Sequence, residues 1–314
     1  MKTVVLDVKT VGGDIDFSEF NKFGDVTIYQ TTPQEEAAER INGADIVIVN
    51  KVRLNESNLK NSGVRLICET ATGYDNIDTD YCRKNGIAVC NVSGYSTDSV
   101  AQVTAAMALS LFSKLSAYNR FVCDGSFEKH DLPMCTEPVF YEVSGKTWGI
   151  IGMGTIGKKV AAVAKALGMN VIAYSRTEKE GFENVGLDEL CQRSDIISLH
   201  CPLNDGTYHI INENNLSLMK NTAVLINAAR GAVVDEKAVT DAIKSGKIGA
   251  FAADVYSKEP ISPDNPYNEI AGRDNVILTP HMAWGAKEAR QRCVDETVKN
   301  VQAFLDGEMR NRIV

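Results

Sequence analysis

Residues 148–168, WGIIGMGTIGKKVAAVAKALG, contain a short apolar strand, a glycine turn and an amphipathic helix. The turn has the spacing Gly152-x-Gly154-x-x-Gly157. In such a turn the first glycine allows a tight bend, the second lets the backbone approach a pyrophosphate, and the third lets helix and strand pack closely. Because a strand precedes the glycines and a helix follows them, the stretch predicts a dinucleotide site, with a purely structural turn as the alternative.

The beginning of this helix and the end of the next strand indicate which dinucleotide would bind. Thr155 and Ile156 offer backbone amides and the positive end of the helix dipole to a phosphate. The strand ends at Ser175-Arg176, where an acid that binds the ribose 2′-hydroxyl usually stands. Ser175 can donate a hydrogen bond and Arg176 can pair with a 2′-phosphate. The sequence therefore favours NADP(H); NAD(H) stays open, with Arg176 as a solvated side chain.

Strand-like and helix-like stretches alternate along the chain, which is typical of right-handed βαβ units with parallel sheets. Five such strands, ending near Val92, form a first α/β unit. An apolar helix at 99–118 and an irregular segment follow. Six more strands then begin at residues 147, 170, 195, 223, 249 and 275. Six strands suit a doubly wound sheet. The chain closes with an amphipathic helix, 286–308, whose apolar face must pack on another element.

The composition is that of a globular protein and argues against several partners. The 314 residues suffice for about two domains, and 44% are hydrophobic and 24% charged. A net charge of −8 argues against nucleic acid. The opening MKTVVLDVKT is expected to be a strand rather than a signal peptide, and the stretch 99–118 contains polar residues, so we expect a cytoplasmic protein with no membrane span. Eight scattered cysteines without C-x-x-C spacing predict free thiols, with neither disulfides nor a metal site.

The choice of an acid/base group is narrow, because the chain has only four histidines, His130, His200, His209 and His281. Ligands of open α/β sheets bind beyond the carboxyl ends of strands, which favours His200 and His281. Arg230, Asp254 and Glu259 each follow a predicted strand in the same way. Taken singly, each of these residues could be a surface charge or a helix cap. Their shared place after strands favours His281 as the candidate acid/base group.

Seven stretches resemble the D-isomer-specific 2-hydroxyacid dehydrogenases, in the expected order and over nearly the whole chain. They are ATGYDNID, SVAQ, GIIGMGTIGKKVA, SLHCPLNDGTYHIIN, LINAARGAVVDEKAV, ADVYSKEP and TPHMAW. The resemblance implies an α/β fold of two doubly wound parallel-sheet domains. A Rossmann dinucleotide-binding domain, 99–285, would be inserted into a flavodoxin-like substrate domain made of 1–98 and 286–314. It also implies hinges near the two crossings and a homodimer joined through the dinucleotide-binding domains.

The resemblance further implies roles for individual residues. Arg230 would bind the substrate carboxylate and polarise the keto oxygen. His281 would donate a proton to that oxygen, and Glu259 would pair with His281 to favour the imidazolium. Asp254 is expected near the nicotinamide carboxamide. Further cofactor contacts are expected from Cys201, Pro202, Thr207, Ala228 and Ala229.

Four more residues are expected at the substrate. The resemblance implies that the backbone amides of Thr72 and Gly73, in the loop ATGYD, hold the substrate carboxylate. Lys51 would face the same pocket, or else be a solvated charge. Trp284 would line the mouth of the pocket, or only anchor the last helix.

The stretch TPHMAW, with a tryptophan three residues after the histidine, looks most like the glycerate dehydrogenase and hydroxypyruvate reductase branch. We therefore expect reduction of hydroxypyruvate, and also glyoxylate, to the D-2-hydroxy acid. Two departures from the family pattern leave the identity of the substrate acid open. Phe127 stands where many relatives carry Trp, and Ala71 replaces a glycine of the substrate loop. The alternatives are a D-lactate or aromatic 2-hydroxyacid dehydrogenase and, from another class, a dinucleotide-sensing scaffold like the C-terminal-binding-protein corepressors.

Overall fold

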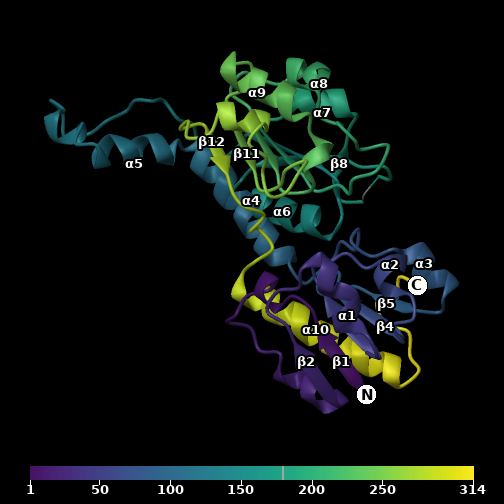
Figure 1. The fold of residues 1–314 in the computed structure, drawn as a ribbon. Coiled ribbons are helices and arrows are strands. Elements are labelled where there is room, and N and C mark those ends of the chain that lie inside the picture. Colours follow the sequence, from purple (N-terminus) through teal and green to yellow (C-terminus); the bar gives the residue numbers. More distant parts are fainter. Residues whose placement is uncertain (179) are drawn as a thin grey trace. The chain divides into compact units, whose positions relative to one another are not determined.

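The computed structural model describes residues 1–178 and 180–314, and the chain divides into two units (Figure 1). The first unit comprises residues 1–96 and 284–314, and the second comprises residues 97–283. The sequence predicted the crossings after residues 98 and 285, whereas the structure has them after 96 and 283. The second unit is therefore a continuous insertion in the first.

The first unit is built on a parallel five-stranded sheet with the order β2-β1-β3-β4-β5. Its strands are β1 (Lys2–Val5), β2 (Asp25–Ile28), β3 (Ile46–Val49), β4 (Leu66–Glu69) and β5 (Ala88–Cys90). This 2-1-3-4-5 order is that of flavodoxin-like sheets. Every residue of β3, β4 and β5 is buried, as expected for parallel strands covered on both faces.

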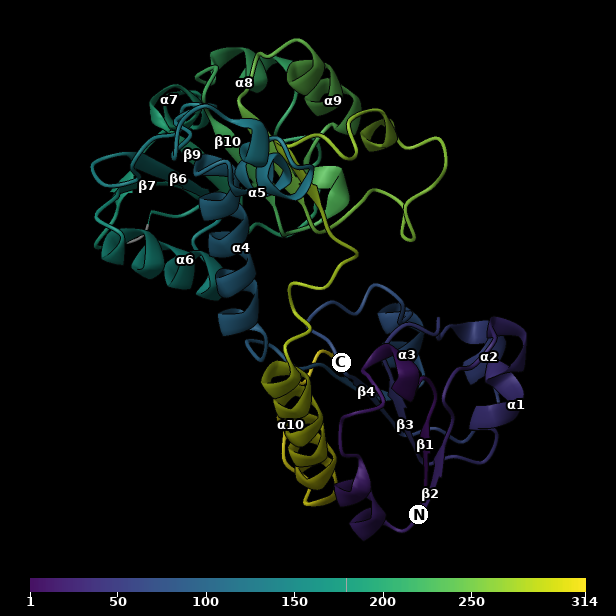
Figure 2. The same ribbon diagram turned by 90° about the vertical axis from the view of Figure 1, so that its left-hand side faces the viewer.

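Helices cover the two faces of this sheet (Figure 2). On one face lie α1 (Ala37–Ile41), α2 (Glu56–Leu59) and α3 (Thr79–Lys84). On the other lie the 3-10 helix Ser18–Phe23 and α10 (Lys287–Leu305). The predicted closing helix thus finds its partner within the first unit, because Val294, Val298 and Val301 of α10 pack against the sheet.

The second unit contains a parallel seven-stranded sheet with the order β12-β11-β10-β9-β6-β7-β8. Its strands are β6 (Thr147–Ile151), β7 (Asn170–Tyr174), β8 (Glu183–Asn184), β9 (Ile196–Leu199), β10 (Val224–Asn227), β11 (Ala250–Ala253) and β12 (Val276–Leu278). The order is that of a Rossmann sheet with one further strand, and it reverses between β6 and β9. All six predicted strands are present. The seventh, β8, was not predicted, since two residues carry no periodicity.

The second sheet is also covered on both faces. One face carries α4 (Thr97–Phe112) and α6 (Thr155–Ala166), which share a core with Trp148 and Ile150. The other carries α7 (Leu187–Arg193), α8 (Glu213–Leu218) and α9 (Glu236–Lys244) over Leu225 and Phe251. The helices thus lie on the faces of the sheet, and the loops that follow the carboxyl ends of its strands carry the predicted site.

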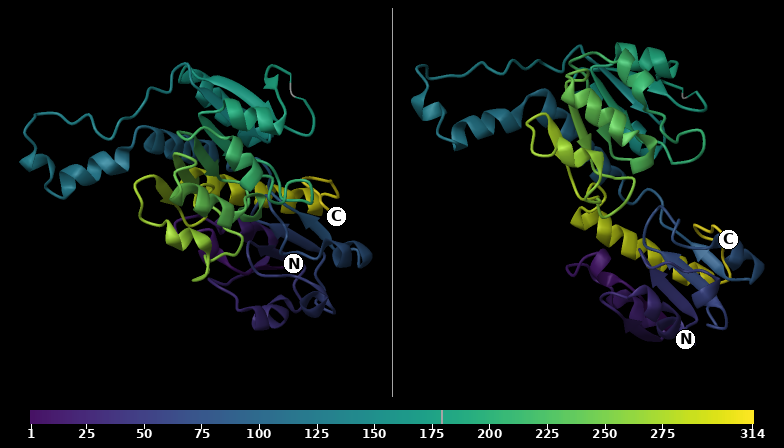
Figure 3. Two further views of the ribbon diagram at one scale, coloured as in Figure 1. Left: turned by 90° about the horizontal axis from the view of Figure 1, so that it is seen from above. Right: turned by 45° about the horizontal axis from the view of Figure 1, so that its top comes forward.

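The single helix predicted at 99–118 is wrong, because the chain forms two helices there. α4 ends at Phe112 and α5 runs over Leu115–Cys123. Lys114 lies between them at φ +54°, a left-handed conformation that interrupts the helix. Figure 3 shows α5 and the segment after it extending away from the rest of the second unit. Within the described residues no single helix is long and apolar enough to cross a membrane; only α4 and α5 together pass that test, and they are bent by 64°.

Candidate functional site

The three glycines of the predicted dinucleotide turn differ in their surroundings. Gly152 has φ +97°, and a Cβ there would lie 2.7 Å from the backbone nitrogen of Cys201. A Cβ on Gly157 would lie 2.1 Å from the carbonyl oxygen of Gly152. These two glycines are thus required by close packing of β6, β9 and α6. At Gly154, by contrast, no atom of the described part of the chain lies within 4 Å of the Cβ position, so a pyrophosphate could approach the backbone there.

The other predicted cofactor contacts surround this open position. Gly154 is the N-cap of α6, so the amides of Thr155 and Ile156 have no intrahelical partner. Cys201 and Pro202 follow β9, and Ala228 and Ala229 follow β10, two strands paired at the same sheet edge. The Thr207 hydroxyl donates to the carbonyl of Pro202 at 2.6 Å and orders this loop. The residues present therefore fit a dinucleotide at the point where the strand order reverses.

Ser175 and Arg176, just after β7, differ in whether their side chains are available to bind a 2′-phosphate. The Ser175 hydroxyl donates a 2.6 Å hydrogen bond to the carbonyl oxygen of Thr177. The donor that the sequence predicted for a 2′-phosphate is thus already used within the turn. Arg176 is exposed. Its guanidinium is therefore the better placed of the two groups to pair with phosphate charge.

His281 and Glu259 form a hydrogen-bonded pair. Nδ1 of His281 lies 2.6 Å from Oε2 of Glu259, and both side chains are about one-third exposed (31% and 35%). The two residues lie beyond the carboxyl ends of β12 and β11, which are adjacent parallel strands. Glu259 Oε1 accepts from the backbone N–H of Tyr256 at 3.1 Å, which orients the carboxylate. Because the pair uses Nδ1, Nε2 is the nitrogen that can reach a substrate.

Asp254 anchors the loop on which His281 stands. It is 2% exposed and follows β11 directly. One carboxylate oxygen accepts from Thr279 Oγ1 at 2.6 Å and from the N–H of Met282 at 2.9 Å; the other accepts from the N–H of Ala283 at 2.8 Å. These hydrogen bonds fix the chain before and after His281, whose backbone has φ +51°. The predicted contact between Asp254 and the nicotinamide carboxamide stays a prediction.

Arg230 follows β10, the neighbour of β11, so the three predicted catalytic residues lie beyond three consecutive strands of one sheet. Its Nη1 donates to the carbonyl of Ala229 at 2.9 Å, and its own carbonyl accepts from Asn227 Nδ2 at 2.9 Å. A Cβ on the next residue, Gly231, would lie only 1.9 Å from the carbonyl carbon of Tyr256. The backbone beside Arg230 therefore touches the loop that carries Glu259.

The other three histidines have different surroundings. His200 Nε2 lies 3.0 Å from Ser198 Oγ, and its buried Nδ1 has no hydrogen-bond partner among the residues that the structure describes. Burial lowers the pKa of His200 to about 4, so its ring is neutral at physiological pH and is a poor proton donor. The ring of His209 stacks on Tyr208 with centroids 4.0 Å apart. His130 lies in the segment after α5 and packs edge-on against Phe121.

The residues predicted to bind substrate other than Arg230 belong to the first unit. The amide of Lys51 donates to Asp7 Oδ2 at 2.6 Å, while the Lys51 side chain is exposed. Thr72 Oγ1 donates to the carbonyl of Val92 at 2.9 Å, which fixes the loop that continues into Gly73. Their roles toward a substrate stay predictions.

Trp284 is the first residue of the returning chain of the first unit. Its ring stands edge-on to Tyr95 with centroids 6.3 Å apart, beside buried Ala289 and Cys293 of α10. This packing supports the reading in which Trp284 anchors the last helix.

Sequence reasoning missed the buried carboxyl groups of Asp7, Glu69 and Glu236. Glu69, at the end of β4, accepts a 3.0 Å hydrogen bond from Asn76 Nδ2, and burial raises its pKa well above the usual range. Glu236, at the start of α9, hydrogen-bonds the loop that carries Glu259. In the sequence, Glu236 looks like an ordinary acid in the first turn of a helix. Its only local signal was its place inside the stretch VVDEKAV.

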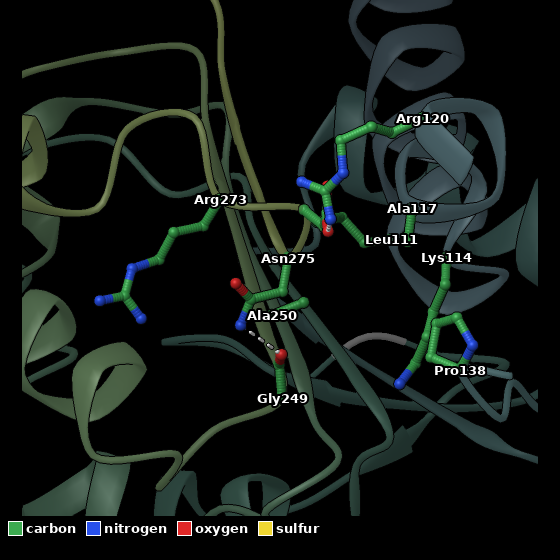
Figure 4. Close-up of a pocket in the computed structure, with 10 residues that line it drawn as sticks. Leu111, Lys114, Ala117, Arg120, Pro138, Gly249, Ala250, Arg273 and Asn275 are labelled. Carbon is green, nitrogen blue, oxygen red and sulfur yellow. Dashed lines mark hydrogen bonds and ion pairs between the residues drawn. The ribbon is translucent and has the colours of Figure 1, made fainter. Parts of the chain in front are cut away.

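A cavity of about 420 Å³ lies elsewhere in the second unit (Figure 4). Its lining includes Leu111 of α4, Arg120 of α5, and Gly249 and Asn275, which precede β11 and β12. The cavity is thus at the amino ends of these strands, whereas the predicted catalytic residues follow the carboxyl ends. It is not part of the catalytic site. Among residues 1–178 and 180–314, no group of three or more His, Cys, Asp or Glu side chains could hold a metal ion.

Comparison with known proteins gives consistent matches. Residues 105–283 match the family model described as D-isomer specific 2-hydroxyacid dehydrogenase, NAD binding domain. The chain is 38% identical to the hydroxypyruvate reductase of Blautia hydrogenotrophica, with 98% of each chain covered. It is 36% identical to the glycerate dehydrogenase of Methylorubrum extorquens, over 99% of this chain and 98% of that one. Among solved structures it is similar to an acyclic imino acid reductase in complex with NADPH and D-Arg, with TM-score 0.88, 33% identity and full coverage of both chains.

Proposed function

The chain belongs to the D-isomer-specific 2-hydroxyacid dehydrogenase family, and we therefore propose that it reduces hydroxypyruvate, and also glyoxylate, to the D-2-hydroxy acid. Membership of this family makes it an oxidoreductase. The observation that carries the proposal is the 2.6 Å hydrogen bond between His281 Nδ1 and Glu259 Oε2. This pair lies at the sheet edge where Arg230 and the dinucleotide turn also stand.

The proposed mechanism assigns one task to each residue. Arg230 binds the substrate carboxylate through its fork of N–H groups and polarises the keto oxygen. The glycine turn 152–157 would hold the dinucleotide, whose nicotinamide would supply hydride to the keto carbon. His281 donates its Nε2 proton to the keto oxygen and forms the O–H bond, while the carboxylate of Glu259 stabilises the protonated imidazole before transfer.

The choice of hydroxypyruvate is supported by TPHMAW and by the names of the two curated relatives. D-lactate and aromatic 2-hydroxy acids remain alternatives. The likeness to an imino acid reductase adds one more, since a protonated C=N group could take the place of the keto group beside the same acid. A dinucleotide-sensing scaffold would bind the cofactor without turnover.

Initial rates with the purified protein test this proposal. Hydroxypyruvate, glyoxylate, pyruvate and phenylpyruvate would each be offered with NADPH and with NADH, together with pyruvate plus methylamine as an imine source. We expect the highest kcat/KM with hydroxypyruvate. A higher value with the imine would make imine reduction the function, and no turnover in the presence of demonstrable cofactor binding would support the scaffold.

We expect a preference for NADPH that depends on Arg176. Arg176→Ala removes the exposed guanidinium that would pair with the 2′-phosphate, and hydrogen bonds to charged groups contribute about 1.5–3 kcal/mol. The KM for NADPH is therefore expected to rise by roughly tenfold or more, while the KM for NADH changes little. The matched control is Arg83→Ala, which removes an exposed arginine of the first unit. Equal changes with both dinucleotides, or better use of NADH by the unaltered enzyme, would make Arg176 an ordinary surface residue.

A homodimer is also proposed, with α5 and the segment after it as the contact surface. This part of the chain exposes many large apolar side chains, Leu115, Val122, Phe127, Leu132, Met134, Val139, Phe140 and Tyr141. An exposed apolar surface of this kind is typical of protein interfaces. Light scattering is expected to give twice the chain mass of 34.2 kDa. The variant Phe140→Glu should shift the protein to the monomer, and a wild-type monomer would contradict the proposal.

A further inference from the structure

We propose that Glu236 is a positioning residue that holds Glu259 in place to pair with His281, and that it thereby controls the proton donation step. The proposal rests on the proposed function, in which His281 is the proton donor. Glu236 does not touch the reacting atoms in this scheme; it acts through the loop between β11 and β12.

The side chain of Glu236 is enclosed by this loop. It is 9% exposed and stands at the first position of α9. Oε1 accepts from the N–H of Ser257 at 2.8 Å, and Oε2 accepts from Ser257 Oγ at 2.7 Å and from Asn265 Nδ2 at 2.8 Å. Ser257 lies two residues before Glu259, and Asn265 lies six residues after it. One carboxylate therefore fixes both ends of the segment that carries Glu259.

The arrangement requires a carboxylate, because each of its oxygens faces a group that can only donate: Oε1 faces the N–H of Ser257 and Oε2 faces Nδ2 of Asn265. The orientation of Asn265 is set independently, since its Oδ1 accepts from the N–H of Tyr267 at 2.9 Å. Its Nδ2 must then face Glu236. Charge-assisted hydrogen bonds are about twice as strong as neutral ones, so the interaction holds the segment firmly.

The same segment is held from two further directions. Across from Glu236, a Cβ on Gly231 would lie 2.2 Å from the backbone nitrogen of Ser257, so this part of the loop also touches the residue after Arg230. Tyr256 donates its N–H to Glu259 and its hydroxyl to the carbonyl of Thr279, at 3.1 and 2.9 Å. A shift of Ser257 would thus be passed directly to Glu259.

The variant Glu236→Gln tests the proposal. The amide keeps the size and one acceptor, but it turns an Nε2 donor toward Asn265 Nδ2 or toward Ser257. We expect kcat to fall by about 10- to 100-fold, as small misplacements of catalytic groups do, while the Kd for the dinucleotide is unchanged. The matched control is Glu213→Gln, because Glu213 is also the first residue of a helix but is exposed. It should leave kcat unchanged.

A second substitution distinguishes positioning from a general loss of structure. In the double variant Glu236→Gln with Asn265→Asp, donor and acceptor are exchanged: the amide at position 236 donates to the new carboxylate at position 265. Asp also retains the oxygen that caps Tyr267. The double variant is expected to recover most of kcat, whereas Asn265→Asp alone places two carboxylates together and should be impaired. If Glu236→Gln fails to fold, Ser257→Ala, which removes one of the three hydrogen bonds, takes its place.

Proton NMR provides a readout that does not depend on turnover. The Nδ1–H of His281 in its short bond to Glu259 should give a strongly downfield resonance, identified by its loss in Glu259→Gln. We expect this resonance to disappear in Glu236→Gln and to return in the double variant. A folded Glu236→Gln protein with unchanged resonance and kcat would overturn the proposal, as would failure of the double variant to recover either. If the wild-type enzyme turned over none of the 2-oxo acids, only the proposed function would be contradicted. The His281 resonance would still test whether Glu236 positions Glu259.

Discussion

Replacing His281 by Asn is expected to lower kcat for reduction by about 10²- to 10⁴-fold, the usual contribution of a positioned acid. Asparagine is the suitable replacement because His281 has φ +51°, a left-handed conformation that Asn tolerates better than most side chains. The loop held by Asp254 should therefore keep its shape. The amide cannot supply a proton, so the loss should appear in kcat, measured at saturating substrate, while the Kd for the dinucleotide stays the same.

The chain offers a closely matched control in His209. It has φ +47°, so His209→Asn makes the same chemical change in the same backbone conformation. His209 lies in the loop after β9 and its Nδ1 is 4.0 Å from Asp235, with no part in the Glu259 pair. We expect His209→Asn to retain kcat within about twofold, as for a surface substitution. A His281→Asn enzyme with comparable kcat would exclude His281 as the proton donor.

Local patterns were sufficient to predict most of the fold. Strand-like stretches of four or more residues and the glycine turn at 152–157 predicted both parallel sheets, because burial on both faces imposes continuous apolar runs. The break between α4 and α5 could not be predicted in this way. Lys114 adopts a left-handed conformation that its residue type disfavours, so the residue types at this point do not indicate a break.

The position of the catalytic residues in the fold could be predicted, because it follows from the sheet topology. Arg230, Glu259 and His281 each follow a strand, and carboxyl ends of neighbouring parallel strands share one edge. Hydrogen bonds were not predictable from residue type alone. The Ser175 hydroxyl was expected to face a phosphate but bonds to Thr177 two residues away. The role of Glu236 depends on partners 21 and 29 residues along the chain, which no local pattern reveals.

Replacing Arg230 by Ala is expected to lower kcat/KM for 2-oxo acids by about 10³-fold or more. Removal of one donor that stabilises developing oxygen charge costs about 10²- to 10³-fold, and the carboxylate of the substrate loses its partner as well. The backbone at this position should survive, because Asn227 bonds to the Arg230 carbonyl and Gly231 packs through its main chain. The variant should therefore bind the dinucleotide normally, which fluorescence titration would measure.

Two further variants separate charge from geometry at this position. Arg230→Lys keeps the positive charge but loses the planar fork that binds a carboxylate and a keto oxygen together, so its kcat/KM should lie between those of the wild type and Arg230→Ala. Arg273→Ala removes an exposed arginine at the opposite edge of the same sheet and should have no effect. Full activity of Arg230→Lys would mean that charge alone suffices. Full activity of Arg230→Ala on every accepted 2-oxo acid would contradict the mechanism, in which Arg230 binds the substrate carboxylate.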